Sequence, residues 1–149
     1  MKGFHRVMIA TDLTAASGPA FRAAVDFAGD GAELTIVHAY QPPTTTPTDA
    51  LAPALYEQLD AGLRASAERR LRPLVEGARR DGVNARALVL SGPPSQAIAR
   101  AAEDNHADIL VLGTHGRKGV SRFFLGSVAS RVVSMAPCPV MTVRGDCRR

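Results

Sequence analysis

Residues 107–116, ADILVLGTHG, are the stretch that decides the fold. The stretch begins as an apolar, β-branched run that predicts a buried strand, and it ends in a loop with two glycines. Nine residues separate the second glycine from Gly126 and Ser127, and residues 127–133 predict a helix. Glycines let main-chain N–H groups approach an anion, and a helix N-terminus offers unpaired donors and the positive end of the helix dipole. The order strand, glycine loop, helix therefore indicates a phosphate-binding site.

This glycine pattern differs from the two commonest nucleotide-binding motifs. No Lys-Ser or Lys-Thr pair closes it, so it is not a Walker loop, and it is not the dinucleotide pattern G-x-G-x-x-G. The rest of the chain must therefore decide what the loop binds.

The whole chain alternates predicted strands with predicted helices. The strands are expected at residues 4–10, 33–40, 84–90, 107–112 and 137–143. Their near-continuous apolar runs are typical of parallel strands that are buried on both faces. We therefore predict an α/β fold, a single-domain open five-stranded parallel sheet with helices on both faces. Ligands of such sheets lie at the carboxyl ends of the strands, where the strand order reverses.

Three features between the strands carry more specific expectations. Ser17 can cap a helix that begins at Gly18 and Pro19. Apolar residues at helical spacing from Leu55 to Ala78 predict a long amphipathic helix, which Pro73 should kink or split. The proline-rich residues 41–53 predict a long surface loop, a candidate lid or partner site, although simple mobility is the interpretation we favour.

Composition restricts the class of protein. The chain has 149 residues, 46% of them hydrophobic, and no apolar run near the roughly 20 residues of a membrane span. We expect one domain over residues 1–144 with a polar tail at 145–149. The N-terminal apolar stretch is too short for a signal peptide, so we expect a cytoplasmic protein without membrane contact. Cys138 and Cys147 support no disulfide framework.

The positive charge does not indicate nucleic-acid binding. The net charge is +4, but the arginines of residues 64–86 are interleaved with acidic side chains, and the chain has no Trp and only two Tyr to stack on bases. This spacing is typical of a solvated helix face, so we expect no nucleic-acid partner.

Polar residues at the strand ends are candidates for the site. Asp12 ends the first strand and can accept a hydrogen bond from a ribose or adenine group, hold a divalent ion, or only cap the next turn. His38, at the end of the second strand, is more often a packed, hydrogen-bonded residue than a catalytic one. Within the glycine loop, His115 can donate to a phosphate, and Arg117 is best placed to balance phosphate charge. No residue is an evident general base aimed at a phosphate.

The sequence resembles the universal stress protein family over essentially its full length. The resemblance rests on residues 6–12 (RVMIATD), residues 36–39 (IVHA), the pattern Gly113-x2-Gly116-x9-Gly126-Ser127, and residues 137–143 (PCPVMTV). The glycine pattern with its final serine is similar to that of the family's ATP-binding branch. The resemblance implies a Rossmann-like, adenine-nucleotide α-hydrolase-like fold and a homodimer formed through the last strand.

The resemblance also implies roles for individual residues. Positions matching Thr11 and Asp12 meet the nucleoside, and the one matching Ala39 contacts adenine through its main chain, although Ala39 replaces a larger aliphatic residue. The ribose and phosphates are expected to meet Gly113, His115, Gly116, Arg117, Gly126, Ser127 and Val128. A divalent cation, Mg²⁺ or Mn²⁺, commonly accompanies the phosphates, and which residues hold it stays open.

These expectations favour an ATP-binding, nucleotide-sensing module of the stress response over an enzyme. A slow ATPase or phosphotransferase, and a cyclic-AMP-binding member of the same family, are the alternatives. The downstream protein partner cannot be inferred from the sequence.

Overall fold

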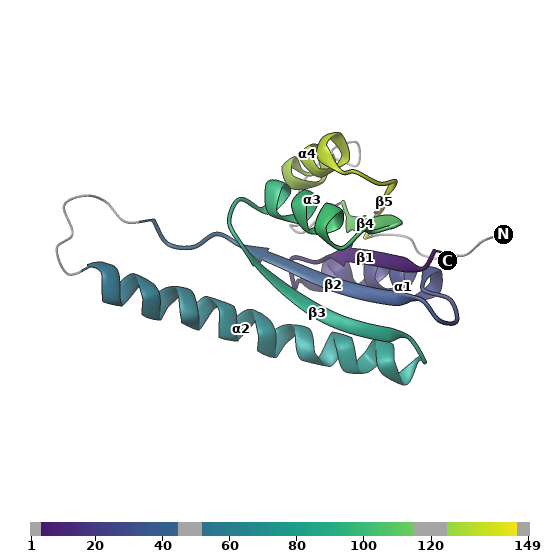
Figure 1. The fold of residues 1–149 in the computed structure, drawn as a ribbon, viewed down its shortest axis with the longest axis horizontal. Coiled ribbons are helices and arrows are strands. Elements are labelled where there is room, and N and C mark those ends of the chain that lie inside the picture. Colours follow the sequence, from purple (N-terminus) through teal and green to yellow (C-terminus); the bar gives the residue numbers. More distant parts are fainter. Residues whose placement is uncertain (1–3, 45–51, 115–124, 146–149) are drawn as a thin grey trace.

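The computed structural model describes residues 4–44, 52–114 and 125–145, and this part of the chain forms one five-stranded parallel sheet (Figure 1). The strands are β1 (Arg6–Ala10), β2 (Glu33–Tyr40), β3 (Asn84–Ser91), β4 (Ile109–Gly113) and β5 (Val140–Val143). Their order in the sheet is β3-β2-β1-β4-β5. The predicted fold class, an open parallel sheet in a single α/β domain, is therefore confirmed.

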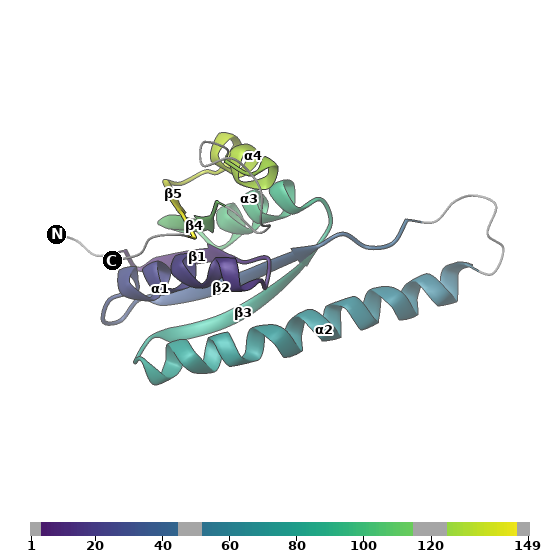
Figure 2. The same cartoon turned by 180° about the vertical axis from the view of Figure 1, so that it is seen from behind.

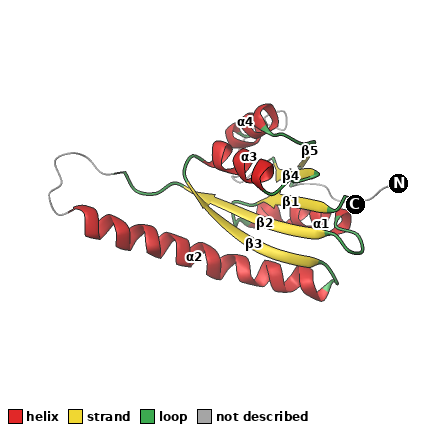
Figure 3. Ribbon diagram, viewed as in Figure 1, coloured by secondary structure: helices red, strands yellow, loops and turns green. Residues whose placement is uncertain are grey.

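Four α-helices of the described residues cover the two faces of this sheet (Figures 2 and 3). They are α1 (Gly18–Phe27, after a short 3₁₀ turn, Ala15–Ser17), α2 (Ala52–Arg80), α3 (Pro94–Asp104) and α4 (Ser127–Met135). Helices α1 and α2 lie on one face, and α3 and α4 lie on the other. The sheet is the middle layer of three.

Alternate residues of the central strands form two separate cores. In β1, Val7 and Ile9 pack toward α1 and α2, whereas Met8 and Ala10 pack toward α3 and α4. The side chains of β4 alternate in the same way, and those of Ile109–Leu112 are all buried. Burial on both faces explains why these strands are apolar without interruption.

The strand boundaries differ slightly from the prediction. β1 begins at Arg6 rather than residue 4, and β4 at Ile109 rather than 107. β5 begins at Val140 because Pro139, which has no N–H, contributes only its carbonyl to the ladder, accepting a bond from Leu110.

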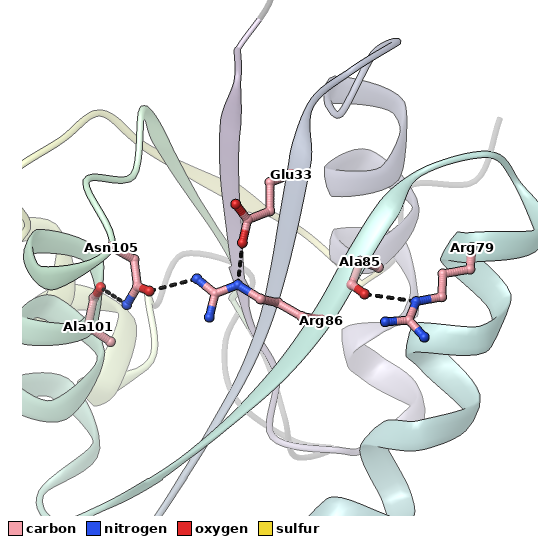
Figure 4. A network of polar contacts seen from close by, with 6 residues as sticks. All are labelled: Glu33, Arg79, Ala85, Arg86, Ala101 and Asn105. Carbon is pink, nitrogen blue, oxygen red and sulfur yellow. Dashed lines mark hydrogen bonds and ion pairs between the residues drawn. The ribbon is translucent and has the colours of Figure 1, made fainter.

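Of the two effects expected of Pro73, a kink or a split, the split is wrong, because α2 is a single helix of 29 residues with Pro73 inside it. Its second half is fixed to the sheet by the buried side chains Ala67, Leu71, Val75 and Ala78. In its last turn, Arg79 Nε donates to the Ala85 carbonyl of β3 at 3.0 Å (Figure 4). These contacts hold both sides of the proline in place, so the loss of one helical hydrogen bond does not end the helix.

The first half of α2 extends past the sheet (Figure 1). Three leucines that we expected on the inward face are exposed: Leu55 (54%), Leu59 (47%) and Leu63 (43%). The hydroxyl of Tyr40, at the end of β2, donates to Asp60 Oδ1 at 2.8 Å. The helical spacing was correct, but there is no sheet beneath these leucines to bury them.

A polar network lies at the amino end of the sheet, away from the strand ends that carry the site (Figure 4). Arg86 on β3 pairs with Glu33 on β2, and its Nη2 donates to Asn105 Oδ1 at 2.7 Å. The Asn105 amide donates in turn to the Ala101 carbonyl of α3 at 2.7 Å. The network joins the edge strand β3 to its neighbour and to the end of α3.

Candidate functional site

A pocket of about 570 Å³ opens at the carboxyl ends of β1 and β4, where the strand order reverses. This is the place at which open α/β sheets bind ligands, and the volume is in the usual range of a small-molecule site. Its lining comes from β1, β2, β4, α3 and α4 and the turn after β1. The residues are Ala10, Thr11, Asp12, Ser17, His38, Ala39, Pro94, Ile98, Leu112, Gly113, Thr114, Gly126, Ser127, Val128 and Ala129.

Asp12 organises the turn that follows β1. Its Oδ1 accepts hydrogen bonds from the Thr14 amide at 2.9 Å, the Thr14 hydroxyl at 2.7 Å and the Ser17 hydroxyl at 2.6 Å. Partial burial raises the pKa of this carboxyl, but the bonds from Ser17 and Thr14 together outweigh burial and leave the pKa below its usual value of 3.8. Asp12 is therefore a carboxylate at neutral pH and caps the turn with one oxygen.

Ser17 does not cap α1 as we expected. It holds a helical backbone conformation and makes no side-chain bond to the helix amides, and its hydroxyl donates to Asp12. The prediction was wrong because the 3₁₀ turn Ala15–Ser17 leads directly into α1, so Ser17 lacks the extended backbone angles of a capping residue.

The backbone of this turn has an uncommon conformation. Leu13 has φ +64°, in the left-handed region that residues with a Cβ rarely adopt. Its amide donates to Thr11 Oγ1 at 3.0 Å, and the Thr11 amide donates to the Val37 carbonyl of β2 at 2.9 Å. The Thr11 side chain is buried, with 7% of the residue exposed, and its hydroxyl oxygen holds the turn.

His38 lines the pocket from β2 and is bound to the same turn. Its Nδ1 lies 2.9 Å from the Thr11 carbonyl oxygen. Because a carbonyl can only accept, Nδ1 carries the hydrogen in this contact. The packed, hydrogen-bonded role that we considered more common for such a histidine fits this geometry.

The opposite side of the pocket is formed by the start of α4. Gly126 is the N-cap residue and Ser127 the first residue of the helix, so the amides of its first turn lie at the pocket. A Cβ on Gly126 would lie 3.3 Å from the Thr114 carbonyl oxygen, closer than most real Cβ contacts. A Cβ on Gly113 would instead face the start of α1, at 3.9 Å from Ala16, Ser17 and Ala20. Of these two glycines, Gly126 is the one whose added Cβ would make a close contact at the pocket.

Seven of the ten residues predicted to hold a nucleotide line this one pocket. They are Thr11, Asp12, Ala39, Gly113, Gly126, Ser127 and Val128. The other three, His115, Gly116 and Arg117, lie outside the described residues. Pro94 and Ile98, which reach the pocket from α3, were not predicted, and neither was the pairing of Ser17 with Asp12. The pairing could have been predicted from the spacing, because a serine follows the aspartate at the strand end by five residues.

Within residues 4–44, 52–114 and 125–145, no three His, Cys, Asp or Glu side chains gather in a way that could hold a metal ion. Asp12 is the one carboxylate among the described lining residues. Mg²⁺ in proteins is often bound by one or two carboxylates together with substrate phosphates, so a single carboxylate fits a cation that arrives with a nucleotide. No helix of the described part is long and apolar enough to span a membrane.

Comparisons with known proteins agree with this architecture. The chain is 40% identical over 115 residues to a universal stress protein of Thermus aquaticus. The matched region covers 76% of this chain and 79% of the relative. It is 32% identical over 143 residues to the universal stress protein MJ0531 of Methanocaldococcus jannaschii, covering 95% and 82%. Among solved structures, UspA of Lactobacillus plantarum superposes with a TM-score of 0.79 at 29% identity, over 97% of this chain and all of that one.

Two further solved universal stress proteins were determined with ligands. One is a complex with cAMP (TM-score 0.70, 24% identity, 97% of this chain and 100% of that one), and one, from Archaeoglobus fulgidus, is a complex with dAMP (TM-score 0.63, 23% identity, 94% and 98%). At these identities the likeness shows the fold alone. The profile of the Universal stress protein family matches residues 3–144. The chain therefore belongs to the universal stress protein family.

Proposed function

We propose that this protein binds ATP in the pocket between β1 and α4 and acts as a nucleotide-sensing module of the stress response. The observation that carries the proposal is the meeting of Thr11, Asp12 and Ala39 with Gly126 and Ser127 in one pocket. These groups come from two parts of the sequence that are more than 80 residues apart, and they supply a carboxylate, a strand-end backbone and a helix N-terminus. Together they match the parts of a nucleoside triphosphate.

Each side of the pocket fits one part of the ligand. The aliphatic wall formed by Ala10, Ala39, Ile98 and Leu112 suits an adenine ring. The carboxylate of Asp12 suits a ribose hydroxyl or the adenine amino group. The amides at the start of α4 suit the phosphates, because they are unpaired donors at the positive end of the helix dipole. His115, Gly116 and Arg117 would complete the phosphate side, and Mg²⁺ or Mn²⁺ would balance the phosphate charge.

Adenine nucleotides are supported as the ligand class by the family members solved with cAMP and dAMP. The glycine pattern and its final serine favour ATP among them. Asp12 is an unpromising general base, because its lowered pKa and its three hydrogen bonds at Oδ1 make it a poor proton acceptor. We therefore propose binding without efficient turnover.

We further propose a homodimer formed through β5. β5 is an edge strand, and its Val140, Met141 and Val143 are half-buried within one copy of the chain. Pairing with a second β5 would satisfy the open edge and cover these side chains.

Calorimetric melting with a panel of nucleotides tests the proposed ligand. ATP at 100 times its Kd should stabilise the fold by about 2.7 kcal/mol and raise Tm by about 5–10 °C. The panel is ATP, ADP, cAMP, dAMP and adenosine, with GTP as the control for base recognition, each with and without Mg²⁺ or Mn²⁺. If no adenine nucleotide shifts Tm, the proposal is wrong; if cAMP shifts it more than ATP, the ligand is cAMP.

Radiolabelled ATP separated by thin-layer chromatography measures turnover, and many turnovers per minute would identify an enzyme.

A further inference from the structure

The turn that carries Thr11 and Asp12 contains a backbone conformation that its own sequence disfavours. Leu13 has φ +64°, a region that suits glycine or asparagine and not a leucine. Such a residue keeps its conformation only where the surrounding structure holds it. The contacts of Leu13 therefore identify what keeps Asp12 in place.

Two of these contacts are local. The Leu13 amide donates to Thr11 Oγ1 at 3.0 Å, and the Thr14 amide donates to Asp12 Oδ1 at 2.9 Å. Both bonds lie within the turn, so they can move with it as one unit. The turn is fixed to the rest of the protein at Thr11, by its bonds to Val37 and His38, and at the Leu13 side chain, which packs against the core.

A third contact comes from a distant part of the chain. Arg70 Nη2, on α2, donates to the Leu13 carbonyl oxygen at 2.8 Å across 57 residues of sequence. Arg70 is next to Leu71, which is 0% exposed, and follows Ala67, which is 4% exposed, so its base is part of the segment of α2 that is fixed to the sheet. The guanidinium therefore ties the turn to a rigid element.

From these contacts we infer that Arg70 is a positioning residue of the nucleotide site. It holds the Leu13 carbonyl, which keeps residue 13 in its left-handed conformation and sets Thr11 and Asp12 at the pocket. This inference rests on the proposed function, since it assigns to α2 a part in nucleotide affinity. Arg70 lines no wall of the pocket among the described residues, so it acts through the turn.

A different role would be simple attraction between the Arg70 charge and the phosphates. The two roles predict different ligand dependence. A residue that positions the nucleoside-binding turn affects adenosine and ATP equally, because both contain the nucleoside. A residue that attracts phosphates affects ATP and leaves adenosine binding unchanged, and its effect falls as salt rises.

Isothermal titration calorimetry with adenosine and with ATP separates these roles. We compare the wild type with Arg70→Ala, Arg70→Lys and Arg72→Ala; Arg72 is exposed on the same helix and serves as the matched control for charge and helix content. Arg70→Ala should weaken both ligands by about fivefold to twentyfold, Arg70→Lys should recover part of this loss, and Arg72→Ala should bind like the wild type. Equal affinities of Arg70→Ala and Arg72→Ala, or a loss confined to ATP, would overturn the inference.

Amide hydrogen exchange of the ligand-free protein separates this inference from the proposed function. The amides of Leu13 and Thr14 should exchange about tenfold faster in Arg70→Ala than in Arg72→Ala, while amides of β1 exchange at the same rate in both. Unchanged exchange at residues 13 and 14 would show that Arg70 does not order the turn. If the exchange changes as expected but the wild type binds no adenine nucleotide, the proposed function fails, and the assignment of Arg70 to a nucleotide site fails with it.

Discussion

The Ser17 hydroxyl donates a 2.6 Å hydrogen bond to Asp12 Oδ1, and both residues line the same pocket. The bond joins the start of α1 to the end of β1 and directs one oxygen of the carboxylate into the turn. It is one of the bonds that keep Asp12 charged against the effect of burial. The stability that Asp12 contributes is accordingly present above the ordinary carboxyl pKa of 3.8 and is lost as pH falls below it.

Ser17→Ala should raise the pKa of Asp12 toward its ordinary value, because it removes a hydrogen bond to the charged form. It should also lower the free energy of unfolding by about 0.5–1.5 kcal/mol at pH 7. A carbon-detected NMR titration of the Asp12 carboxyl and urea unfolding measure these changes. Ser134→Ala is the control, since Ser134 donates to a helix carbonyl on the exposed side of α4. An unchanged Asp12 pKa in Ser17→Ala would show that the serine does not stabilise the carboxylate.

Gly126→Val should abolish ATP binding and leave the protein folded. The backbone angles of Gly126, φ −55° and ψ 155°, are accessible to valine, but its Cβ would lie 3.3 Å from the Thr114 carbonyl oxygen, at the pocket. Gly29→Val is the matched control, because Gly29 lies outside the pocket and a Cβ there meets nothing within 4 Å, and it should bind ATP. Calorimetric titration measures the affinities and circular dichroism the fold. Normal ATP binding by folded Gly126→Val would place the phosphates elsewhere.

Thr142→Pro should convert the proposed dimer into a monomer. The carbonyls of Pro139 and Val143 accept bonds from β4, so the alternation along a strand turns the backbone of Thr142 toward the open edge. Proline there removes an outward N–H and leaves the bonds to β4 intact. Light scattering after size-exclusion chromatography gives the mass, with Thr142→Val as the control that keeps the N–H. A dimer of Thr142→Pro would place the interface on another surface.

Asp108→Asn should lower stability at neutral pH and have no effect in acid. Asp108 Oδ2 accepts the His5 and Arg6 amides at 2.9 and 2.8 Å, and these bonds, that of Arg6 first, lower its pKa despite some burial. The stability that the Asp108 carboxylate contributes is fully present above pH 3.8, the ordinary pKa of the group. It is lost as pH falls through the lower pKa that Asp108 has in the folded protein. We expect a loss of about 1 kcal/mol or less at pH 7, since the carboxyl is exposed.

Urea unfolding of Asp108→Asn and wild type from pH 2 to pH 7 measures this difference. Asp30→Asn, in the exposed turn before β2, is the control and should match the wild type throughout. A gap between Asp108→Asn and wild type that does not shrink toward pH 2 would mean that the charge of Asp108 is not what stabilises the strand start.

Leu59→Gln should change the free energy of unfolding by less than about 0.5 kcal/mol, whereas Leu71→Ala should lower it by about 2–5 kcal/mol. The two leucines lie on one helix, but Leu59 is 47% exposed and Leu71 is 0% exposed. Chemical unfolding of both variants measures the contrast. A large loss in Leu59→Gln would show that the first half of α2 packs against something in solution, such as a second copy.

The sequence predicted β1, β4 and the start of α4 because each depends on a local pattern: an apolar run, or a glycine before a helical period. The order of the strands in the sheet does not follow from such patterns. The predicted strands are similarly apolar, so no strand indicates which other strand lies beside it. The strand-end position of Asp12 placed it at the same edge of the sheet as the glycine loop, and the family resemblance then implied the ligand.

The errors have physical causes that particular residues show. Leu55, Leu59 and Leu63 were expected inside because a helical period says nothing about how far the sheet extends. A helix of 29 residues is about 43 Å long, and an eight-residue strand about 26 Å, so part of α2 had to project. Arg70 and Leu13 were not predicted to meet, because their contact depends on where α2 crosses the sheet.

The pocket is assembled from residues 10–12 at one end and residues 126–129 at the other. During synthesis the pocket is therefore incomplete until residues 126–129 have emerged from the ribosome. The strands β1, β2 and β3 and the helix α2 emerge first and must pair and pack without help from a ligand. A ligand of this pocket can therefore stabilise the fold only after residues 126–129 have been added, and it cannot assist the earlier pairing of these strands.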